Sequence, residues 1–338
     1  MGDPDRPIVM VSFSASNRDP LTSALVDALS AHVTVRHFSW RGALLGRYDV
    51  LNVHWPDHLT KRHGLLSTVA RRVMYLLLLL RLRWGRPVLV RTLHNINPHE
   101  GRHGSELALL RLTDRWTEMY VTMQPDPPIT GSGQVRLIPQ GHYRNVYDQL
   151  PTAPSVRGRL LFFGLVRGYK GVPGLIEAFA RSEDEDATLR VVGREHDQQS
   201  GDDVRRAAAG DPRVSLALEW VSHETLALEV GQAELVVLPY TEIFNSGTVI
   251  VALSMDRPVL VPRHATTEAL AREVGPGWVF TFDQPLTAAD LEETLRSLRT
   301  NPPADRPDLS ARDWHEVARG YAATYQEAID AHRSHRRH

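Results

Sequence analysis

The chain has 338 residues, of which 42% are hydrophobic and 23% are charged. This length exceeds the size at which one hydrophobic core usually stops growing, so we expect two domains, and the composition excludes a largely disordered chain. The 39 Lys and Arg residues nearly balance the 40 Asp and Glu residues, which gives no global attraction to nucleic acid. The absence of cysteine excludes disulfides, thiolate metal sites and cysteine nucleophiles.

Short apolar runs alternate with segments of helical periodicity along the first 150 residues. The runs predict parallel strands at residues 7–13, 33–38, 49–54, 88–93, 119–122 and 135–138. Helices are predicted at residues 21–31 and, as one long segment, at 65–84. This alternation is typical of a Rossmann-like domain.

The periodicity is lost between residues 149 and 157, where Pro151 and Pro154 indicate a linker. Further strands are predicted at residues 159–163, 188–192, 214–218, 235–238 and 258–261, with helices at 172–181, 247–255 and 310–332. We therefore predict three parts: a first Rossmann-like domain, a second Rossmann-like domain, and a C-terminal helix that returns to the first domain. Their predicted bounds are residues 1–150, 151–309 and 310–338.

The loop after the strand at 159–163 has the residues of an anion site. Gly164 lets the backbone approach a ligand closely, and Arg167 and Lys170 can hold the oxygens of a diphosphate. The alternative is a solvated basic turn.

A second anion site is predicted where Asn245, Ser246 and Gly247 open a helix, because free N–H groups at a helix start face a phosphate. The alternative is ordinary helix capping by Asn245 or Ser246. Glu242 precedes this turn and can hold a ribose or sugar hydroxyl, or simply be solvated.

Two segments of the first half, Asn52-Val-His-Trp-Pro-Asp-His and Leu93-His-Asn-Ile-Asn-Pro-His-Glu, each follow a predicted strand. Their loops carry the polar residues His54, Asp57, His94, Asn95, His99 and Glu100. A carboxylate or imidazole at this edge of the sheet can act as a general base, so these loops form a candidate catalytic site. Each histidine alone can instead belong to a satisfied polar network, and no pair has the helical spacing of a zinc motif, so no metal site is predicted.

In its second half, the pattern strand-Gly-x-x-Arg-x-x-Lys-Gly, followed by strand-Pro-x(5)-Asn-Ser-Gly-helix, resembles GT-B glycosyltransferases of the broad family-4 kind. The resemblance covers nearly the whole chain and implies an α/β GT-B fold, with two Rossmann-like domains, a cleft between them and a C-terminal helix. It also implies that Arg167 and Lys170 contact the donor diphosphate, and that Ser246, Gly247 and Thr248 contact a phosphate at the helix start.

One position departs from this pattern. Many retaining members carry two glutamates eight positions apart, and counting on from Glu242 reaches Ile250. The Asn-Ser-Gly turn and the two first-half segments are instead similar to a bacterial group that includes inverting β-mannosyltransferases of exopolysaccharide assembly. This resemblance implies transfer of a hexose from a nucleotide diphosphate sugar, GDP-mannose before a UDP-sugar, to a glycan, glycolipid or small-molecule acceptor, without metal or other cofactor. It also implies that the first domain binds the acceptor and the second binds the nucleotide sugar. The first-half loops would then form the acceptor site, with His54, His94 and Asn95 as contacts, Asp57 or Glu100 as the leading candidates for the general base, and His99 as a further catalytic candidate.

Two alternatives remain open: a non-catalytic nucleotide-sugar-binding protein, which would fit loss of the second glutamate, and a GT-B epimerase. A Rossmann dehydrogenase is disfavoured, because the first strand ends in Ser12-Phe-Ser-Ala-Ser-Asn without the Gly-x-Gly-x-x-Gly turn.

The helix predicted at 65–84 contains the run Leu76 to Leu80 among flanking arginines. It is either a buried helix or a surface that meets anionic lipid, and the run is too short to span a bilayer. The polar N-terminus shows no secretory signal. We therefore expect a cytoplasmic protein with peripheral membrane contact as one option, whose partners are a nucleotide sugar and an acceptor and not nucleic acid.

Overall fold

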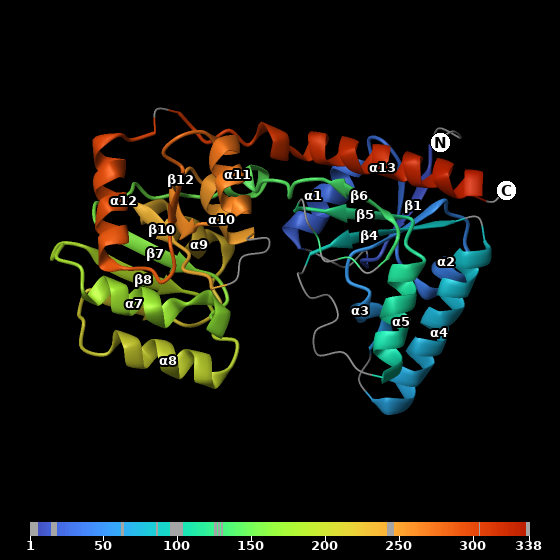
Figure 1. Ribbon diagram of the computed structural model, residues 1–338, viewed down its shortest axis with the longest axis horizontal. Helices are drawn as coiled ribbons and strands as arrows, with labels where there is room; N and C mark the ends of the chain where they lie inside the picture. The colour runs from blue at the N-terminus through green and yellow to red at the C-terminus, as the bar shows by residue number, and fades with distance from the viewer. Residues whose placement is uncertain are drawn as a thin grey trace. The chain divides into compact units, whose positions relative to one another are not determined.

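The structure, a computed structural model, describes residues 6–14, 19–61, 64–85, 87–94, 104–124, 127, 129, 131–241, 247–303 and 305–335. The chain divides into two compact units. Unit 1 comprises Met1–Gly141 and Ala311–His338, and unit 2 comprises His142–Ser310. Each unit is built around a parallel sheet of its own (Figure 1).

Unit 1 has the strand order β2-β1-β3-β4-β5-β6. Its strands are β1 (Ile8–Val11), β2 (Thr34–His37), β3 (Val50–Val53), β4 (Val88–Leu93), β5 (Met119–Thr122) and β6 (Gln134–Leu137). Because β1 pairs with β2 on one side and with β3 on the other, the winding direction reverses between β1 and β3. Open parallel sheets bind ligands beyond the carboxyl ends of the strands at such a switch point.

Helices cover both faces of this sheet. They are α1 (Pro20–Leu29), α2 (Trp40–Leu45), α3 (Asp57–Thr60), α4 (Leu65–Trp84), α5 (Gly104–Arg115) and α13 (Trp314–His335). Side chains alternate along a strand, so Val9 and Val11 pack with α1 and α13 while Met10 packs with α2, α4 and α5. The C-terminal helix therefore completes the core of unit 1.

A buried ion pair joins the sheet to α5. Arg91 of β4 is 1% exposed, Asp114 of α5 is 4% exposed, and the two side chains form a salt bridge. A buried charge costs several kcal/mol unless it is paired, so each of these residues requires the other.

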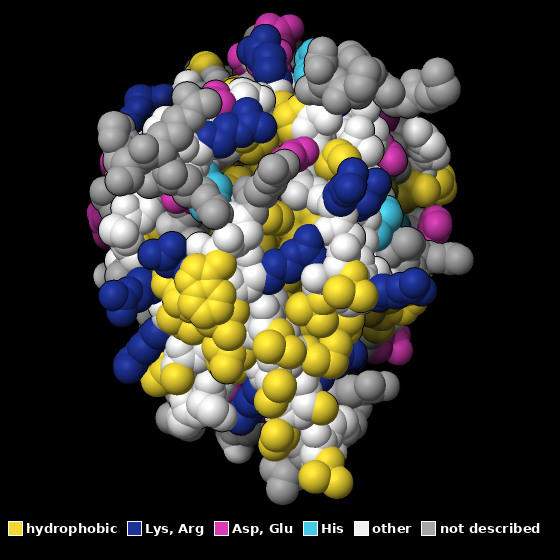
Figure 2. All heavy atoms as spheres, turned by 90° about the vertical axis from the view of Figure 1, so that its right-hand side faces the viewer, with side chains coloured by type: hydrophobic (Ala, Val, Ile, Leu, Met, Phe, Trp, Pro, Cys, Tyr) yellow, Lys and Arg dark blue, Asp and Glu magenta, His cyan; other side chains and the backbone are white. Residues whose placement is uncertain are grey.

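One face of α4 is unusual because it exposes large apolar side chains. Leu66, Val73 and Leu77 are 87%, 52% and 51% exposed, whereas Leu78 and Leu79 on the opposite side are buried. Figure 2 shows hydrophobic side chains gathered on this side of the molecule, with Lys and Arg around and among them. No helix in the described part of the chain is both long and apolar enough to cross a membrane.

Unit 2 has the strand order β12-β11-β10-β7-β8-β9. Its strands are β7 (Arg159–Phe163), β8 (Thr188–Val192), β9 (Val214–Ala217), β10 (Leu235–Val237), β11 (Val259–Pro262) and β12 (Val279–Phe282). Its helices are α6 (Arg144–Tyr147), α7 (Val172–Ala180), α8 (Gln198–Ala208), α9 (His223–Gln232), α10 (Gly247–Ser254), α11 (Ala265–Val274) and α12 (Ala288–Thr300). Here β7 lies between β8 and β10, so the switch point is at β7 and β10.

The predicted α/β architecture is confirmed, and each predicted strand is present within two residues of its predicted ends. One strand, β12, was missed because a four-residue edge segment carries little periodicity. Along the chain, the boundary between the two units lies after Gly141, whereas the predicted boundary was at residue 150. The reason is that Tyr147 of the short helix α6 is buried in the core of unit 2.

Replacement of Asp114 by Ala should lower the free energy of unfolding of unit 1 by about 3–5 kcal/mol, because it removes the carboxylate that pairs directly with the buried Arg91 guanidinium. Urea unfolding followed by circular dichroism measures this loss. The matched control is Glu327→Ala, which breaks the half-exposed pair with Arg136 and should cost less than about 1 kcal/mol. Equal losses in the two variants would contradict the prediction.

Candidate functional site

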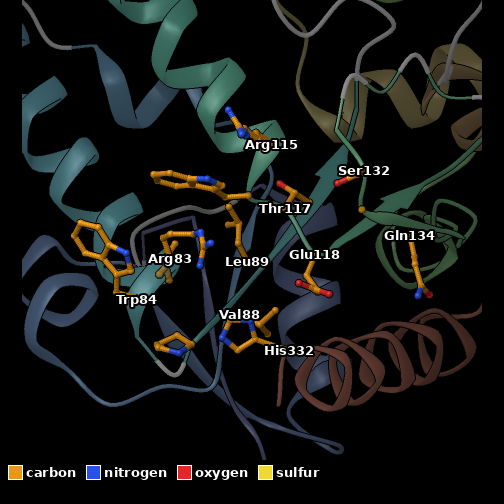
Figure 3. Close-up of a pocket in the computed structure, with 14 residues that line it drawn as sticks. Arg83, Trp84, Val88, Leu89, Arg115, Thr117, Glu118, Ser132, Gln134 and His332 are labelled. Carbon is orange, nitrogen blue, oxygen red and sulfur yellow. The ribbon is translucent and has the colours of Figure 1, made fainter. Parts of the chain in front are cut away.

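The cavity shown in Figure 3 has a volume of about 720 Å³ and lies where β4, β5 and β6 begin. Arg83 and Trp84 reach it from the end of α4, Arg115 from the end of α5, and His332 from α13. Arginine in the last turn of a helix is favoured by the helix dipole without any ligand. None of the catalytic, donor or acceptor residues predicted from the sequence lines this cavity. We therefore do not assign the functional site to it.

The predicted diphosphate loop lies at the switch point of unit 2. Gly164 follows β7 with a φ of 120°, a conformation that side chains disfavour. A Cβ atom on Gly164 would lie 3.5 Å from Thr248 Oγ1, so this glycine faces the first turn of α10. The loop after β7 and the start of α10 are therefore neighbours, as a site for one phosphate-bearing ligand requires.

Arg167 and Lys170 stand at the two ends of a short 3-10 turn, Gly168–Lys170. Within the described residues the buried Nε of Arg167 has no hydrogen-bond partner. The Lys170 ammonium lies 3.6 Å from the centroid of the Tyr240 ring, which holds the charge in place through a cation–π contact. The Tyr169 carbonyl accepts a hydrogen bond of 2.9 Å from the Thr241 N–H, which ties this loop to the segment after β10.

Burial is the main cause that lowers the pKa of Lys170 to about 8; the charge of Arg167 lowers it further, and Tyr169 opposes the shift. A lysine held in this way is a cation that gains from the arrival of an anion, because the ligand supplies the counter-charge that water no longer provides. The site is thus suited to a diphosphate.

The start of α10 supplies the second half of this site. Gly247 and Thr248 form its first turn, where backbone N–H groups are not used within the helix. The other three residues predicted here, Glu242, Asn245 and Ser246, lie outside the described residues.

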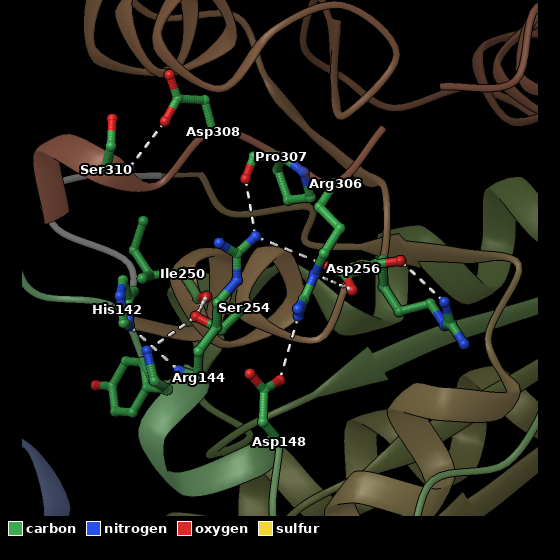
Figure 4. Close-up of polar contacts among 12 residues, drawn as sticks. His142, Arg144, Asp148, Ile250, Ser254, Asp256, Arg306, Pro307, Asp308 and Ser310 are labelled. Atoms are coloured by element: carbon green, nitrogen blue, oxygen red, sulfur yellow. Dashed lines mark hydrogen bonds and ion pairs between the residues drawn. The ribbon is translucent and has the colours of Figure 1, made fainter. Parts of the chain in front are cut away.

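The end of α10 is anchored by the network in Figure 4. The Tyr143 N–H donates to Ser254 Oγ at 2.9 Å, and Ser254 Oγ donates to the Ile250 carbonyl at 2.6 Å. Asp256, just beyond the helix, forms ion pairs with Arg144 at 3.5 Å and with Arg306 at 2.8 Å. The chain segments that enter and leave unit 2 are therefore both fixed to the end of the helix whose start faces Gly164.

Two aromatic residues of this edge were not predicted from the sequence. Tyr240 holds Lys170, and Trp220 follows β9 with 73% of its surface exposed. An exposed tryptophan beyond a strand's carboxyl end is a flat surface on which a planar ring can stack. The Trp-containing turn after the predicted strand at 214–218 was a visible signal, but an isolated aromatic residue does not reveal which edge it occupies.

In unit 1 the structure brings His54 and His94 together at the switch point. His54 follows β3. Its backbone N–H donates a hydrogen bond of 3.0 Å to Oγ of Ser12, which follows β1. His54 Nδ1 and His94 Nε2 are 2.9 Å apart, and the Trp55 ring stacks on His94 with centroids 4.4 Å apart. Burial lowers the pKa of His54 well below its usual value, with His94 adding to the shift, and lowers the pKa of His94 to about 4.

Asp57 lies three residues after His54. It begins α3, which packs on α4 and α5. Burial raises the pKa of Tyr75 to about 12 and lowers the pKa of Arg91, and the charge of Asp57 adds to the first shift and opposes the second. The remaining predicted residues of this half, Asn95, His99 and Glu100, lie outside the described residues. Among the residues that are described, no group of three or more His, Asp or Glu side chains is arranged to hold a metal ion.

The chain is similar in sequence to known glycosyltransferases. Residues 157–300 match the family model described as "Glycosyl transferases group 1". The GDP-mannose:glycolipid 4-beta-D-mannosyltransferase of Xanthomonas campestris pv. campestris is 42% identical over 331 residues, which cover 96% of this chain and 93% of that protein.

Two solved structures share the fold. A glycosyltransferase of Rickettsia africae aligns with a TM-score of 0.62 and 11% identity over 96% of this chain and 99% of that chain. HepE of Anabaena in complex with UDP aligns with a TM-score of 0.58 and 14% identity over 97% of this chain and 98% of that chain. Identities this low show the fold alone, whereas 42% identity over nearly the whole chain shows common family. The chain therefore belongs to the family of the GDP-mannose:glycolipid 4-beta-D-mannosyltransferase and is a hexosyltransferase with the GT-B fold.

Proposed function

We propose that this protein transfers mannose from GDP-mannose to a glycolipid acceptor. The observation that carries the proposal is the pairing of the Arg167 and Lys170 loop with the start of α10 at the switch point of unit 2, in a chain 42% identical to an enzyme named for this reaction. Two cations and the free N–H groups of a helix start lie at one edge of the sheet. Such groups favour a diphosphate over a neutral ligand.

In the proposed reaction, an acceptor hydroxyl oxygen attacks the anomeric carbon while the bond from that carbon to the diphosphate breaks. Arg167, Lys170 and the α10 start near Gly247 and Thr248 stabilise the negative charge that develops on the departing GDP, so this step needs no metal. A β-mannoside formed from α-linked GDP-mannose requires inversion, which a single displacement provides.

The acceptor is assigned to the carboxyl edge of unit 1. Asp57 and Glu100 remain the candidates for the base that removes the hydroxyl proton, with His99 as a further candidate, and Asn95 as an acceptor contact. In unit 2, Glu242, Asn245 and Ser246 complete the proposed donor contacts. Trp220 is proposed to stack on the guanine, since its exposed ring follows a strand of the sheet that holds the diphosphate.

We also propose that unit 1 contacts an anionic membrane surface through α4. The exposed apolar residues of α4 recur at positions 66, 69, 73, 76, 77 and 84, a spacing that places them on one face of the helix. The helix contains four arginines and no acidic residue, which complements the negative charge of lipid headgroups. This contact would bring the acceptor domain to a lipid-linked substrate, in keeping with peripheral attachment at the inner face of the membrane.

The double variant Arg167→Ala/Lys170→Ala should bind GDP at least about 100-fold more weakly and lose nearly all mannosyl transfer, because two charge-assisted contacts of about 1.5–3 kcal/mol each are removed. Isothermal titration calorimetry with GDP and UDP measures the effect and the base preference. Arg206→Ala on α8, whose side chain is 71% exposed, is the matched control. Wild-type affinity in the double variant would disprove the donor site.

The affinity for GDP should fall as the pH rises from 7.5 to 9.5. Below its pKa of about 8 Lys170 is charged and attracts the diphosphate, and above it the charge is lost. Lys170→Arg keeps its charge over this range and should remove most of the pH dependence. This variant also corrects for titration of the nucleotide itself. Parallel pH profiles in the two proteins would contradict the role of Lys170.

The triple variant Leu66→Ser/Val73→Ser/Leu77→Ser should bind phosphatidylglycerol-containing vesicles at least about 100-fold more weakly, as measured by cosedimentation. The reason is that each apolar side chain contributes about 1.5 kcal/mol or more when it enters the bilayer. Added salt should weaken wild-type binding. Leu137→Ser, at a 57% exposed position on β6, is the control. Unchanged vesicle binding in the triple variant would show that α4 is not the contact.

A further inference from the structure

A continuous hydrogen-bonded chain runs from the C-terminal helix to His94. Tyr321 OH of α13 donates to Thr92 Oγ1 at 3.3 Å, and Thr92 Oγ1 donates to Asn52 Oδ1 at 3.1 Å. Asn52 Nδ2 donates to Tyr325 OH, also of α13, at 2.7 Å. The same Nδ2 lies 3.2 Å from His54 Nε2. Asn52, Thr92 and both tyrosines are buried, so water does not substitute for any of these partners.

The orientation of the Asn52 amide decides the protonation of His54. Its oxygen is occupied by the Thr92 hydroxyl, so its nitrogen faces the imidazole. An amide nitrogen only donates, so His54 Nε2 must be the unprotonated, accepting nitrogen. A neutral imidazole has one N–H group, and in His54 that group is therefore on Nδ1.

The tautomer of His54 also fixes the tautomer of His94. His54 Nδ1–H is 2.9 Å from His94 Nε2, so His94 Nε2 accepts and the proton of His94 is on Nδ1. Burial lowers the pKa of both rings and keeps them neutral near pH 7. Each ring therefore carries a single N–H group, and its tautomer is defined. Within the described residues no hydrogen bond reaches His94 Nδ1.

We infer that His94 is a hydrogen-bond donor of fixed tautomer, which presents its Nδ1–H to a hydroxyl oxygen of the acceptor sugar and does not serve as the general base. This inference rests on the proposed function, which assigns the acceptor to this edge of unit 1. A pocket of about 20 Å³ beside His94 and His54 is lined mainly by apolar residues, among them Leu25 and Val317. It has room for a single hydroxyl-sized group, and its apolar walls favour a neutral oxygen over an anion.

His54 and Asn52 are positioning residues, because they act on the substrate only through His94. The proton of the attacking hydroxyl must go to another group, since neither nitrogen of His94 is free to take it. The C-terminal helix acquires a chemical role as well, because its two tyrosines orient the amide from which the whole series of tautomers follows.

The tautomer is read directly by two-bond ¹H–¹⁵N NMR on the full chain labelled with [¹⁵N]histidine, with His54→Gln and His94→Gln spectra used for assignment. We expect His54 and His94 both as Nδ1–H tautomers that do not titrate between pH 6 and 8. An Nε2–H tautomer for His94, which the opposite orientation of the Asn52 amide would produce, overturns the inference, as does titration in this range.

The donor role is tested by two substitutions of similar size. Asn at position 94 places an N–H near the site of Nδ1, whereas Gln reaches the site of Nε2 and can keep the contact with His54. We expect His94→Asn to keep mannosyl transfer within about 10-fold of wild type and His94→Gln to lose about 10- to 100-fold, with unchanged GDP affinity in both. Equal activity of the two variants overturns the donor role. Failure of the proposed function would appear separately, as a wild-type protein that transfers no mannose, while the tautomers are still decided by NMR.

Discussion

Both sheets are wholly parallel and have helices packed on their faces, and this constraint governs where chemistry can occur. Strands buried on both faces carry mostly apolar side chains, so polar groups gather where the strands end. In unit 1 the winding direction reverses between β1 and β3, and in unit 2 between β7 and β10. His54 lies at the first reversal, and Gly164 with the start of α10 at the second. The two candidate sites are thus consequences of topology as much as of residue type.

The two edges differ in electrostatic character, and the difference fits a division of labour. The edge of unit 2 concentrates positive charge on Arg167 and Lys170 and adds the partial charge of a helix start. The edge of unit 1 holds two histidines that burial keeps neutral, linked to uncharged hydroxyl and amide groups. A diphosphate leaving group requires the first environment, whereas a sugar hydroxyl is better held by the second.

The helices α4 and α13 show how one packing layer can serve two purposes. The buried side of α4 fills the core of unit 1, and its other side leaves apolar residues exposed among arginines. The helix α13 contributes Val317 and Ala328 to the same unit's second core, and its tyrosines reach the polar groups between β3 and β4. In each case the helix is needed for folding, and a minority of its side chains remain available for function.

The sequence by itself determined the two-unit α/β architecture, the parallel strands, the long helix at 65–84 and the Arg167 and Lys170 loop, because hydrophobic periodicity and turn residues are local signals. It also pointed to His54 and His94 as polar residues after strands. Only the tertiary structure decided that these two rings touch, that Tyr240 contacts Lys170, and that β12 forms an edge of the second sheet. The continuous leucine run at 76–80 could not show which side of α4 is buried, since that depends on what packs against it. Likewise, the state of His94 depends on Tyr325, more than two hundred residues away, and contacts of that kind arise only when the chain has folded.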